Sequence, residues 1–282
     1  MTIPAHSLRI TADDYGLSAS VNAGIEQLAR QGAISAASVM CHADAELGTA
    51  HALADSKIAT GLHLVLVEER PRCPQRLEPL LDAYGNLPRT YTELFAALVR
   101  RPSLARLLCF EADAQLERYR SLGLPLNFIN SHQHVHLFPP LWSALAPLFE
   151  SCPGARVRSP AGFVFGGVKQ RVLGAVASIA ERVHRLGRER LIVPLGIDFA
   201  GQATLDSCRE LLEALAGATC AGSSQRTATI IEMVMHPGLP DHATLNRYCR
   251  WKYNWKSEHD LLASSALRDL MVQHGFSAEG IS

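Results

Sequence analysis

Short apolar runs alternate along the chain with segments of helical periodicity. Across residues 20–31, apolar side chains recur at helical spacing, and Gly32 then ends the pattern. A second helix is expected at 43–54 and a long helical region from about 91 to 121. The runs that read as strands are 8–12, 36–41, 58–66, 124–131, 155–159, 191–199 and 228–236.

Strands that alternate with helices predict right-handed βαβ units and a parallel sheet. About seven such units over 282 residues favour an α/β fold of the irregular (β/α) TIM-barrel-like kind over an open sheet. No GxGxxG motif follows the first strand, which argues against a dinucleotide site. We therefore expect residues 1–282 to form a single barrel domain.

Composition narrows the class of protein. The chain is 48% hydrophobic and 19% charged with a formal net charge of zero, so nothing favours a nucleic-acid partner. Its seven cysteines include no CxxC pair, which indicates reduced thiols and not a disulfide framework or a zinc ribbon. With no secretion-signal pattern at the start and no apolar run of ~18 residues, we expect a cytoplasmic protein.

Three segments have unusual compositions. The apolar run 162–183 is interrupted by Lys169 and Arg171, which favours an amphipathic packing helix over peripheral contact with a membrane. The Pro-rich connection 67–90 is long enough to suggest a lid over a site. Residues 247–256 mix cations with aromatic rings, which suits contact with a sugar or a lipid headgroup, although an ordinary surface segment is the simpler interpretation.

Four polar clusters follow predicted strands: ADDYG at 12–16, GLH at 61–63, NSHQHVH at 130–136 and MHPG at 235–238. The carboxyl ends of the strands of a parallel barrel share one face, so these clusters should converge. Each has an ordinary explanation taken alone, since Asp favours turns, a lone buried His is usually structural and His-Pro can end a strand. All these explanations would have to hold together, which favours a functional site.

The histidine-rich cluster points to a metal. If the strand continues through it, residues 130, 132, 134 and 136 share one face, and buried imidazoles need partners. Imidazoles with a carboxylate suit Zn²⁺, Fe²⁺, Mn²⁺ and similar ions, and three protein ligands leave room for a water whose pKa the ion lowers. The neighbours Asp13 and Asp14 offer one ligand and one general base, and a further histidine could donate a proton.

In this order, TADDYGLSASVNAGI, GLHLVL, NSHQHVHLFPP and EMVMHPG resemble the YdjC-like carbohydrate deacetylases over about residues 8–240. GLHLVLVEERP and the Asn of NSH are most similar to the branch associated with hopanoid biosynthesis, which deacetylates an N-acetylglucosaminyl lipid. The resemblance implies a TIM-barrel-like fold, a homodimer and one divalent metal ion held by Asp-His-His. Zn, Mg, Mn, Fe and Co are not distinguished.

Carried over position by position, the resemblance implies that Asp14, His63 and His132 hold the metal. It also implies that Asp13 is the general base and His236 the general acid.

The remaining polar positions are implied to orient ligands or to contact substrate, namely Asn130, His134, His136 and Arg158. Many members of the family have Asp where this chain has Asn130, so a second carboxylate is absent there.

The function we expect is removal of an acetyl group from an N-acetylated amino sugar in a glycan or glycolipid. A non-haem iron oxygenase uses a similar ligand set but needs oxygen and a reductant. A non-catalytic metal- or carbohydrate-binding protein would have no use for Asp13. The pairing of Asp13 with His236 therefore favours hydrolysis.

Overall fold

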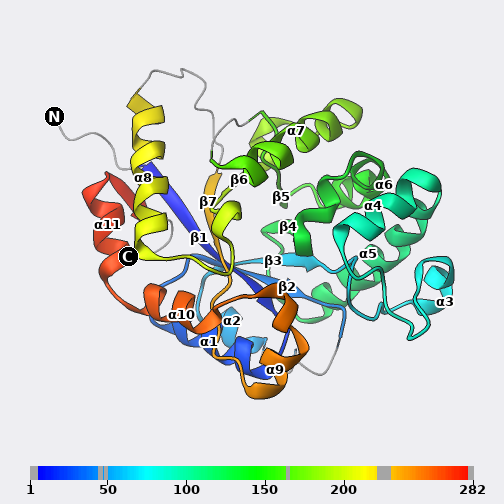
Figure 1. Cartoon of the computed structure of the whole chain (residues 1–282), viewed down its shortest axis with the longest axis horizontal. Helices are drawn as coiled ribbons and strands as arrows, with labels where there is room; N and C mark the ends of the chain where they lie inside the picture. The colour runs from blue at the N-terminus through cyan, green and yellow to red at the C-terminus, as the bar shows by residue number, and fades with distance from the viewer. Residues whose placement is uncertain (1–5, 44–46, 48–49, 163–165, 221–229, 279–282) are drawn as a thin grey trace.

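Parallel strands close into a barrel with helices around it (Figure 1). This computed structural model describes residues 6–43, 47, 50–162, 166–220 and 230–278. Strands β2 to β7 pair in sequence order, β7 pairs with β1, and β1 pairs with β2 to close the ring. The strands are β1 His6–Tyr15, β2 Ala36–Met40, β3 Ala59–Leu64, β4 Phe128–Ser131, β5 Arg156–Arg158, β6 Leu191–Leu195, β7 Ile230–Met235 and β8 Phe276–Ala278.

Helices connect the strands. Short 3-10 turns lie at 78–80, 132–137, 188–190, 197–199 and 249–251. In the part of the chain that the structure describes, no helix has both the length and the hydrophobicity to cross a membrane. The helices are α1 Ala19–Arg30, α2 His51–Asp55, α3 Pro74–Leu77, α4 Tyr91–Arg100, α5 Leu104–Ser121, α6 Pro139–Glu150, α7 Val168–Val183, α8 Leu205–Cys220, α9 His242–Arg247, α10 Trp255–Ala263 and α11 Ala266–Gln273.

The elements follow the expected alternation, and the TIM-barrel-like fold is confirmed. Helix α1 begins where the Ser18 hydroxyl accepts a hydrogen bond from the Val21 amide, at 3.2 Å. The helical region expected at 91–121 is two helices, α4 and α5, separated around Pro102. Of the helix expected at 43–54, residues 44–46 and 48–49 lie outside the described residues, and α2 begins at His51.

The expectation that β4 continues through the histidine-rich cluster is wrong. Strand β4 ends at Ser131, and the next residues form a tight turn in which Gln133 and His134 have left-handed φ values of 53° and 55°. The Ser131 hydroxyl accepts a hydrogen bond from the His136 amide at 3.1 Å, which folds the chain back on the strand end. The histidines therefore point in different directions and do not share one face.

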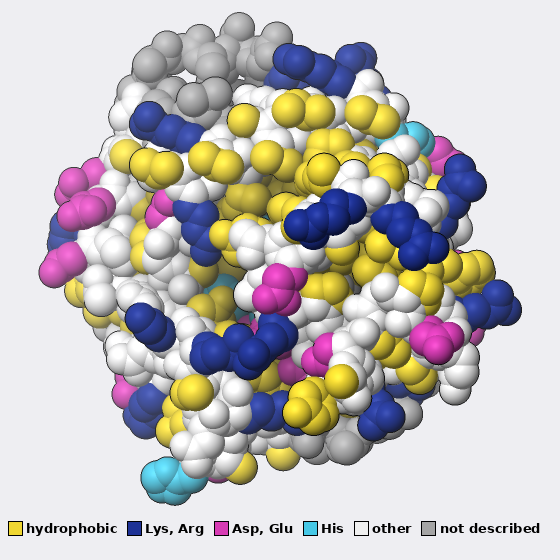
Figure 2. All heavy atoms as spheres, turned by 45° about the vertical axis from the view of Figure 1, so that its right-hand side comes forward, with side chains coloured by type: hydrophobic (Ala, Val, Ile, Leu, Met, Phe, Trp, Pro, Cys, Tyr) yellow, Lys and Arg dark blue, Asp and Glu magenta, His cyan; other side chains and the backbone are white. Residues whose placement is uncertain are grey.

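The buried side chains of the strands are both apolar and polar, and Thr11, Arg158 and Glu232 are among the polar ones. Every residue of β2, β4 and β6 is buried. The outer surface of the molecule is not uniformly polar. Figure 2 shows one face on which hydrophobic side chains gather around a hollow, with Lys and Arg side chains near its edge.

Candidate active site

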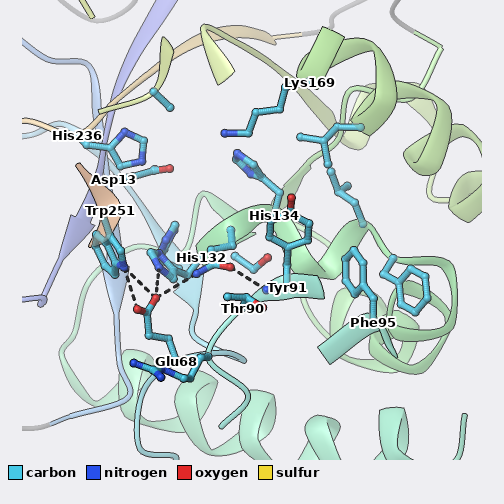
Figure 3. A pocket seen from close by; sticks show the side chains of 18 of the residues that line it. Asp13, Glu68, Thr90, Tyr91, Phe95, His132, His134, Lys169, His236 and Trp251 are labelled. Carbon is cyan, nitrogen blue, oxygen red and sulfur yellow. Dashed lines mark hydrogen bonds and ion pairs between the residues drawn. The ribbon is translucent and has the colours of Figure 1, made fainter. Parts of the chain in front are cut away.

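A cavity of about 530 Å³ lies at the carboxyl ends of the strands (Figure 3). All four polar clusters contribute to it, through Asp13, His63, His132 and His236. One wall is apolar and is formed by helices α4 and α7 and the segment before α6. The apolar lining consists of Tyr91, Phe95, Leu137, Phe138, Val172, Leu173 and Val176.

An irregularity in β1 turns two adjacent carboxylates toward the same site. Neighbouring residues of a regular strand point to opposite faces. Between Ala12 and Tyr15 the pairing of β1 with β2 shifts register, and Asp14 has a left-handed φ of 69°. Such a bulge re-aims side chains. As a result, Asp13 and Asp14 both point into the barrel end, where both are buried.

Asp14, His63 and His132 form a compact group of potential metal ligands. One atom from each lies within 4.8 Å of the others, and all three residues are buried. Asp14 Oδ1 is 3.3 Å from His63 Nε2 and 3.3 Å from His132 Nδ1. Asp14 Oδ2, His63 Nε2 and His132 Nε2 have no hydrogen-bond partner among the described residues. Buried polar atoms are normally paired, so Asp14 Oδ2 and His63 Nε2 fit a bound cation, and His132 turns its Nδ1 toward the same carboxylate.

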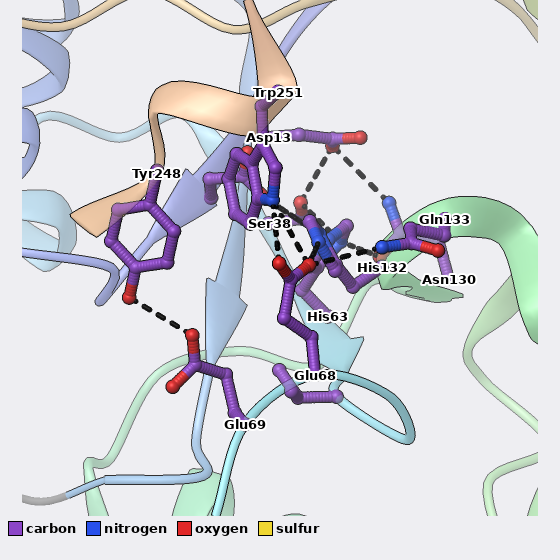
Figure 4. Close-up of polar contacts among 12 residues, drawn as sticks. Asp13, Ser38, His63, Glu68, Glu69, Asn130, His132, Gln133, Tyr248 and Trp251 are labelled. Carbon is purple, nitrogen blue, oxygen red and sulfur yellow. Dashed lines mark hydrogen bonds and ion pairs between the residues drawn. The ribbon is translucent and has the colours of Figure 1, made fainter. Parts of the chain in front are cut away.

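Asn130 orients His63 from behind (Figure 4). His63 Nδ1 lies 2.7 Å from Asn130 Oδ1, which can only accept, so the ring proton sits on Nδ1 and the Nε2 lone pair faces Asp14. The other end of the amide donates to Asp13 Oδ1 at 3.3 Å. An aspartate at 130 could not donate to Asp13. Asn130 therefore forms a bridge between His63 and Asp13.

His132 is surrounded by negative charge. Its Nε2 is 3.8 Å from Glu68 Oε2, on the side opposite Asp14, and its ring packs 4.7 Å from that of Trp251. Burial lowers the pKa of His132, but Asp14 and Glu68 outweigh it and raise the pKa to about 10. Asp14 and Glu68 thus favour a positive charge beside His132, which a bound divalent metal would supply.

Asp13 lies beside this group but is held by a different cation. Arg158 donates to both of its oxygens, at 2.5 and 3.0 Å, and Ser38 Oγ donates at 2.6 Å. Burial alone would raise the pKa of Asp13, but the Arg158 guanidinium holds it well below its usual range. Arg158 is fully buried behind Asp13, and its Nε also pairs with Glu232. It does not line the cavity.

His236 follows β7 and lines the cavity together with Asp13. Its ring packs 4.7 Å from Tyr253, and its Nδ1 has no partner in the described part of the chain. Burial lowers the pKa of His236, although Asp14 and Asp13 oppose this. The resting imidazole is therefore neutral at neutral pH.

The other two histidines of the cluster have separate surroundings. His134 lines the cavity near Lys169, and burial followed by the charge of Arg158 lowers its pKa. His136 is fully buried, with Nδ1 2.6 Å from Ser131 Oγ and Nε2 2.8 Å from the Arg158 carbonyl oxygen. It supports the backbone of Arg158 and does not reach the cavity.

Several cavity residues were not anticipated from the sequence. Glu68 has a left-handed φ of 71° and accepts hydrogen bonds from the Trp251 indole at 3.0 and 2.9 Å. It lies just past β3, so its position after a strand end could have identified it.

Residues 247–256 are more than an ordinary surface segment because Trp251 packs on His132. The ends of the 67–90 connection line the cavity at Glu68 and Arg89, and its movement as a lid stays a prediction.

Three relatives share extended sequence similarity with this chain. A carbohydrate deacetylase of Geobacillus stearothermophilus is 34% identical over 142 residues, 50% of this chain and 55% of that protein, so this match spans about half of its length. A carbohydrate deacetylase of Brevibacillus brevis is 27% identical over 242 residues, 84% of each chain. A chitooligosaccharide deacetylase of Serratia marcescens is 26% identical over 279 residues, 95% of each chain.

Fold and family agree with these matches. The structure of a candidate cellobiose-phosphate cleavage protein of Enterococcus faecalis V583 superposes with a TM-score of 0.73 at 17% identity, covering 97% of each chain. At that identity the likeness concerns the fold alone. The family described as YdjC-like protein matches residues 7–273. This chain therefore belongs to the YdjC-like protein family.

Proposed function

We propose that the protein is a metal-dependent hydrolase that removes the acetyl group from an N-acetylated amino sugar. The observation that carries the proposal is that Asp13 and Asp14, although adjacent, have different partners. Asp14 faces two imidazoles in a potential metal site, whereas its neighbour Asp13 lines the same cavity and is held by Arg158. The relatives named as deacetylases support the reaction type.

Asp14, His63 and His132 would hold the metal. A divalent ion bound there supplies Lewis acidity, which polarises the amide carbonyl and lowers the pKa of water. Asn130 keeps His63 in the tautomer that leaves Nε2 free for the ion.

In the proposed reaction, Asp13 accepts a proton from the attacking water as the new C–O bond forms. Arg158 keeps Asp13 ionised and fixes the direction of its oxygens, at the cost of some basicity. The C–N bond then breaks, and the departing sugar amine takes a proton. His236 is the proposed donor, and because its resting ring is neutral, it first takes up the proton that Asp13 accepted from the water and then passes it to the amine. The products are acetate and the free amino sugar.

The cavity supports a glycolipid as the finer substrate class. A site for sugar alone needs polar groups and a stacking ring, and here Glu68, His134 and Trp251 suit a sugar. The wall formed by Phe95, Phe138 and the α7 side chains is apolar and suits a hydrocarbon. We therefore extend the proposal to an N-acetylglucosaminyl lipid, such as a hopanoid.

Acetate release tests the proposal. Purified protein, loaded in turn with Zn, Mn, Fe, Co or Mg, is assayed on N-acetylglucosamine oligomers and on N-acetylglucosaminyl lipids, under air and under nitrogen. Asp13→Asn should keep the metal and lower kcat by about 10²–10⁴-fold. Turnover that requires oxygen would identify an oxygenase instead. Full metal binding without acetate release from any substrate would support a binding protein.

A further inference from the structure

Helix α7 has four of its six large apolar side chains on the outside, while Leu173 and Val176 are partly buried. Its buried residues are Gln170, Gly174, Ala177 and Ala180, which are small or polar. Its exposed large apolar residues are Val168, Val172, Ile179 and Val183, with exposed fractions of 80%, 57%, 51% and 60%. A surface helix normally turns its large apolar residues to the core. The outward face of α7 is therefore built to contact something other than water.

These side chains form one continuous stripe. Their spacing along the helix is 4, 7 and 4 residues, which places them on a single face. Helix α7 has 16 residues and is therefore about 24 Å long. A contiguous apolar surface of this kind marks an interaction site, whereas single exposed valines do not.

Positive charge borders the stripe. Arg171 and Arg182 are exposed on α7 itself, and Arg185 is exposed just beyond it. At this end of the helix, a second cavity of about 430 Å³ is lined by Arg182, Arg185, Arg188 and Ser178, with Glu181 as its acidic member. Lysine and arginine beside an apolar helix face are typical of helices that lie in the headgroup region of a bilayer.

The stripe is continuous with the candidate active site. Val172 belongs to the stripe and also lines the active-site cavity, together with Leu173 and Val176 of the same helix. In Figure 1, α7 lies at the rim of the barrel, and the hydrophobic side chains in the upper part of Figure 2 lead toward the hollow in that face. Whatever covers the stripe thus lies beside the cavity opening.

We propose that the outward face of α7 docks on an anionic lipid bilayer. A bilayer offers an apolar interior for the valines and Ile179, and acidic headgroups for Arg171, Arg182 and Arg185. A second copy of the chain fits less well. A twofold contact through this face would bring the arginines of both copies close together, and the acids that adjoin α7 are Glu181 and Asp198, the latter already bonded to the first amides of the helix. Docking would turn the cavity opening toward the membrane.

Vesicle flotation tests the docking directly. The full chain is mixed with vesicles of phosphatidylcholine alone or with about a third phosphatidylglycerol, at low and at high salt. Wild type should float with the anionic vesicles and be released by salt. Ile179→Gln with Val183→Gln should lower the partition coefficient at least tenfold, because two apolar side chains no longer enter the bilayer. Glutamine keeps the helix propensity.

Matched controls isolate the stripe. Val99→Gln with Val272→Gln changes two valines with exposed fractions of 69% and 67% on α4 and α11, and should float like wild type. Arg182→Gln with Arg185→Gln should remove the preference for anionic vesicles while leaving circular dichroism unchanged.

Three results would overturn the docking. Wild type that ignores both kinds of vesicle would do so, as would an equal loss of flotation in the Val99 and Val272 control. A wild-type dimer that Ile179→Gln and Val183→Gln convert to monomer, without vesicle binding, would assign the stripe to a second copy. None of these readouts depends on acetate release, so the docking and the deacetylase proposal can fail separately.

Discussion

At the scale of single residues, the site depends on what each side chain faces. Asp13 and Asp14 are identical side chains one position apart. The bulge in β1 directs both inward, yet Asp14 meets His63 and His132 while Asp13 meets Arg158. A carboxylate that faces two imidazoles therefore lies beside a carboxylate that is paired with a guanidinium. This separation allows metal binding and proton transfer to be tested by different substitutions.

The first prediction concerns the metal ligands. Alanine at Asp14, His63 or His132 should each sharply lower the metal content, because each removes one of three converging donor atoms. Elemental analysis after dialysis against a weak chelator measures the effect. His134→Gln is the matched control and should keep the metal, since His134 lies outside the group. Wild-type metal content in all three alanine variants would refute the assignment.

The second prediction concerns the residue behind the ligands. Asn130→Ala removes the acceptor that fixes His63 Nδ1, so metal affinity should fall by roughly 10–100-fold. Competition with a fluorescent chelator measures the dissociation constant. His136→Ala is the control. Its ring contacts Ser131 and the Arg158 backbone and not His63, so we expect a smaller loss of metal affinity than in Asn130→Ala. An unchanged constant in Asn130→Ala would mean that the tautomer is set elsewhere.

At the scale of elements, buried charges join strands that are distant in sequence. Arg158 on β5 pairs with Asp13 on β1 and with Glu232 on β7, and Thr11 on β1 also donates to Glu232 at 2.6 Å. None of these groups is exposed. One buried guanidinium thus compensates two buried carboxylates and joins three strands of the barrel.

The third prediction follows from this network. Arg158→Met leaves two buried carboxylates unpaired and should lower the free energy of unfolding by roughly 3–5 kcal/mol, measured by urea denaturation. Adding Glu232→Gln should restore part of the loss because one of the unpaired charges is removed. Arg120→Met, an exposed arginine on α5, is the control and should change stability by less than about 0.5 kcal/mol. A loss of under ~1 kcal/mol in Arg158→Met would contradict the network.

At the scale of the whole molecule, the sequence predicted the barrel because each strand is a distinct apolar run between helical segments. It predicted the residues at the strand ends because polar clusters after parallel strands converge. The left-handed turn at Gln133 and His134 was missed, since neither residue is Gly. The segments 67–90 and 247–256 were singled out, but Glu68 and Trp251 within them were not, because their positions depend on how these two connections fold over the barrel end. The place of Arg158 behind Asp13 depends on how the barrel closes, which local patterns do not encode.

The last prediction concerns the pH dependence of global stability. Glu258 on α10 accepts hydrogen bonds from the amides of His236 and Ala203, at 2.5 and 2.8 Å, and so ties the C-terminal helices to the barrel end. Burial raises the pKa of Glu258 from 4.5 to about 7, although these backbone hydrogen bonds oppose the rise. The folded state then binds more protons than the unfolded state between these values, so stability falls as the pH rises.

From pH 5 to pH 8, this one group should cost roughly 2–3 kcal/mol of stability. Urea unfolding of wild type and Glu258→Gln at both pH values measures it, because the glutamine cannot ionise and its variant should lose less stability by about that amount. Glu213→Gln, on the exposed side of α8, is the matched control and should keep the wild-type slope. Parallel pH profiles for wild type and Glu258→Gln would show that the buried carboxyl does not change its ionisation in this range.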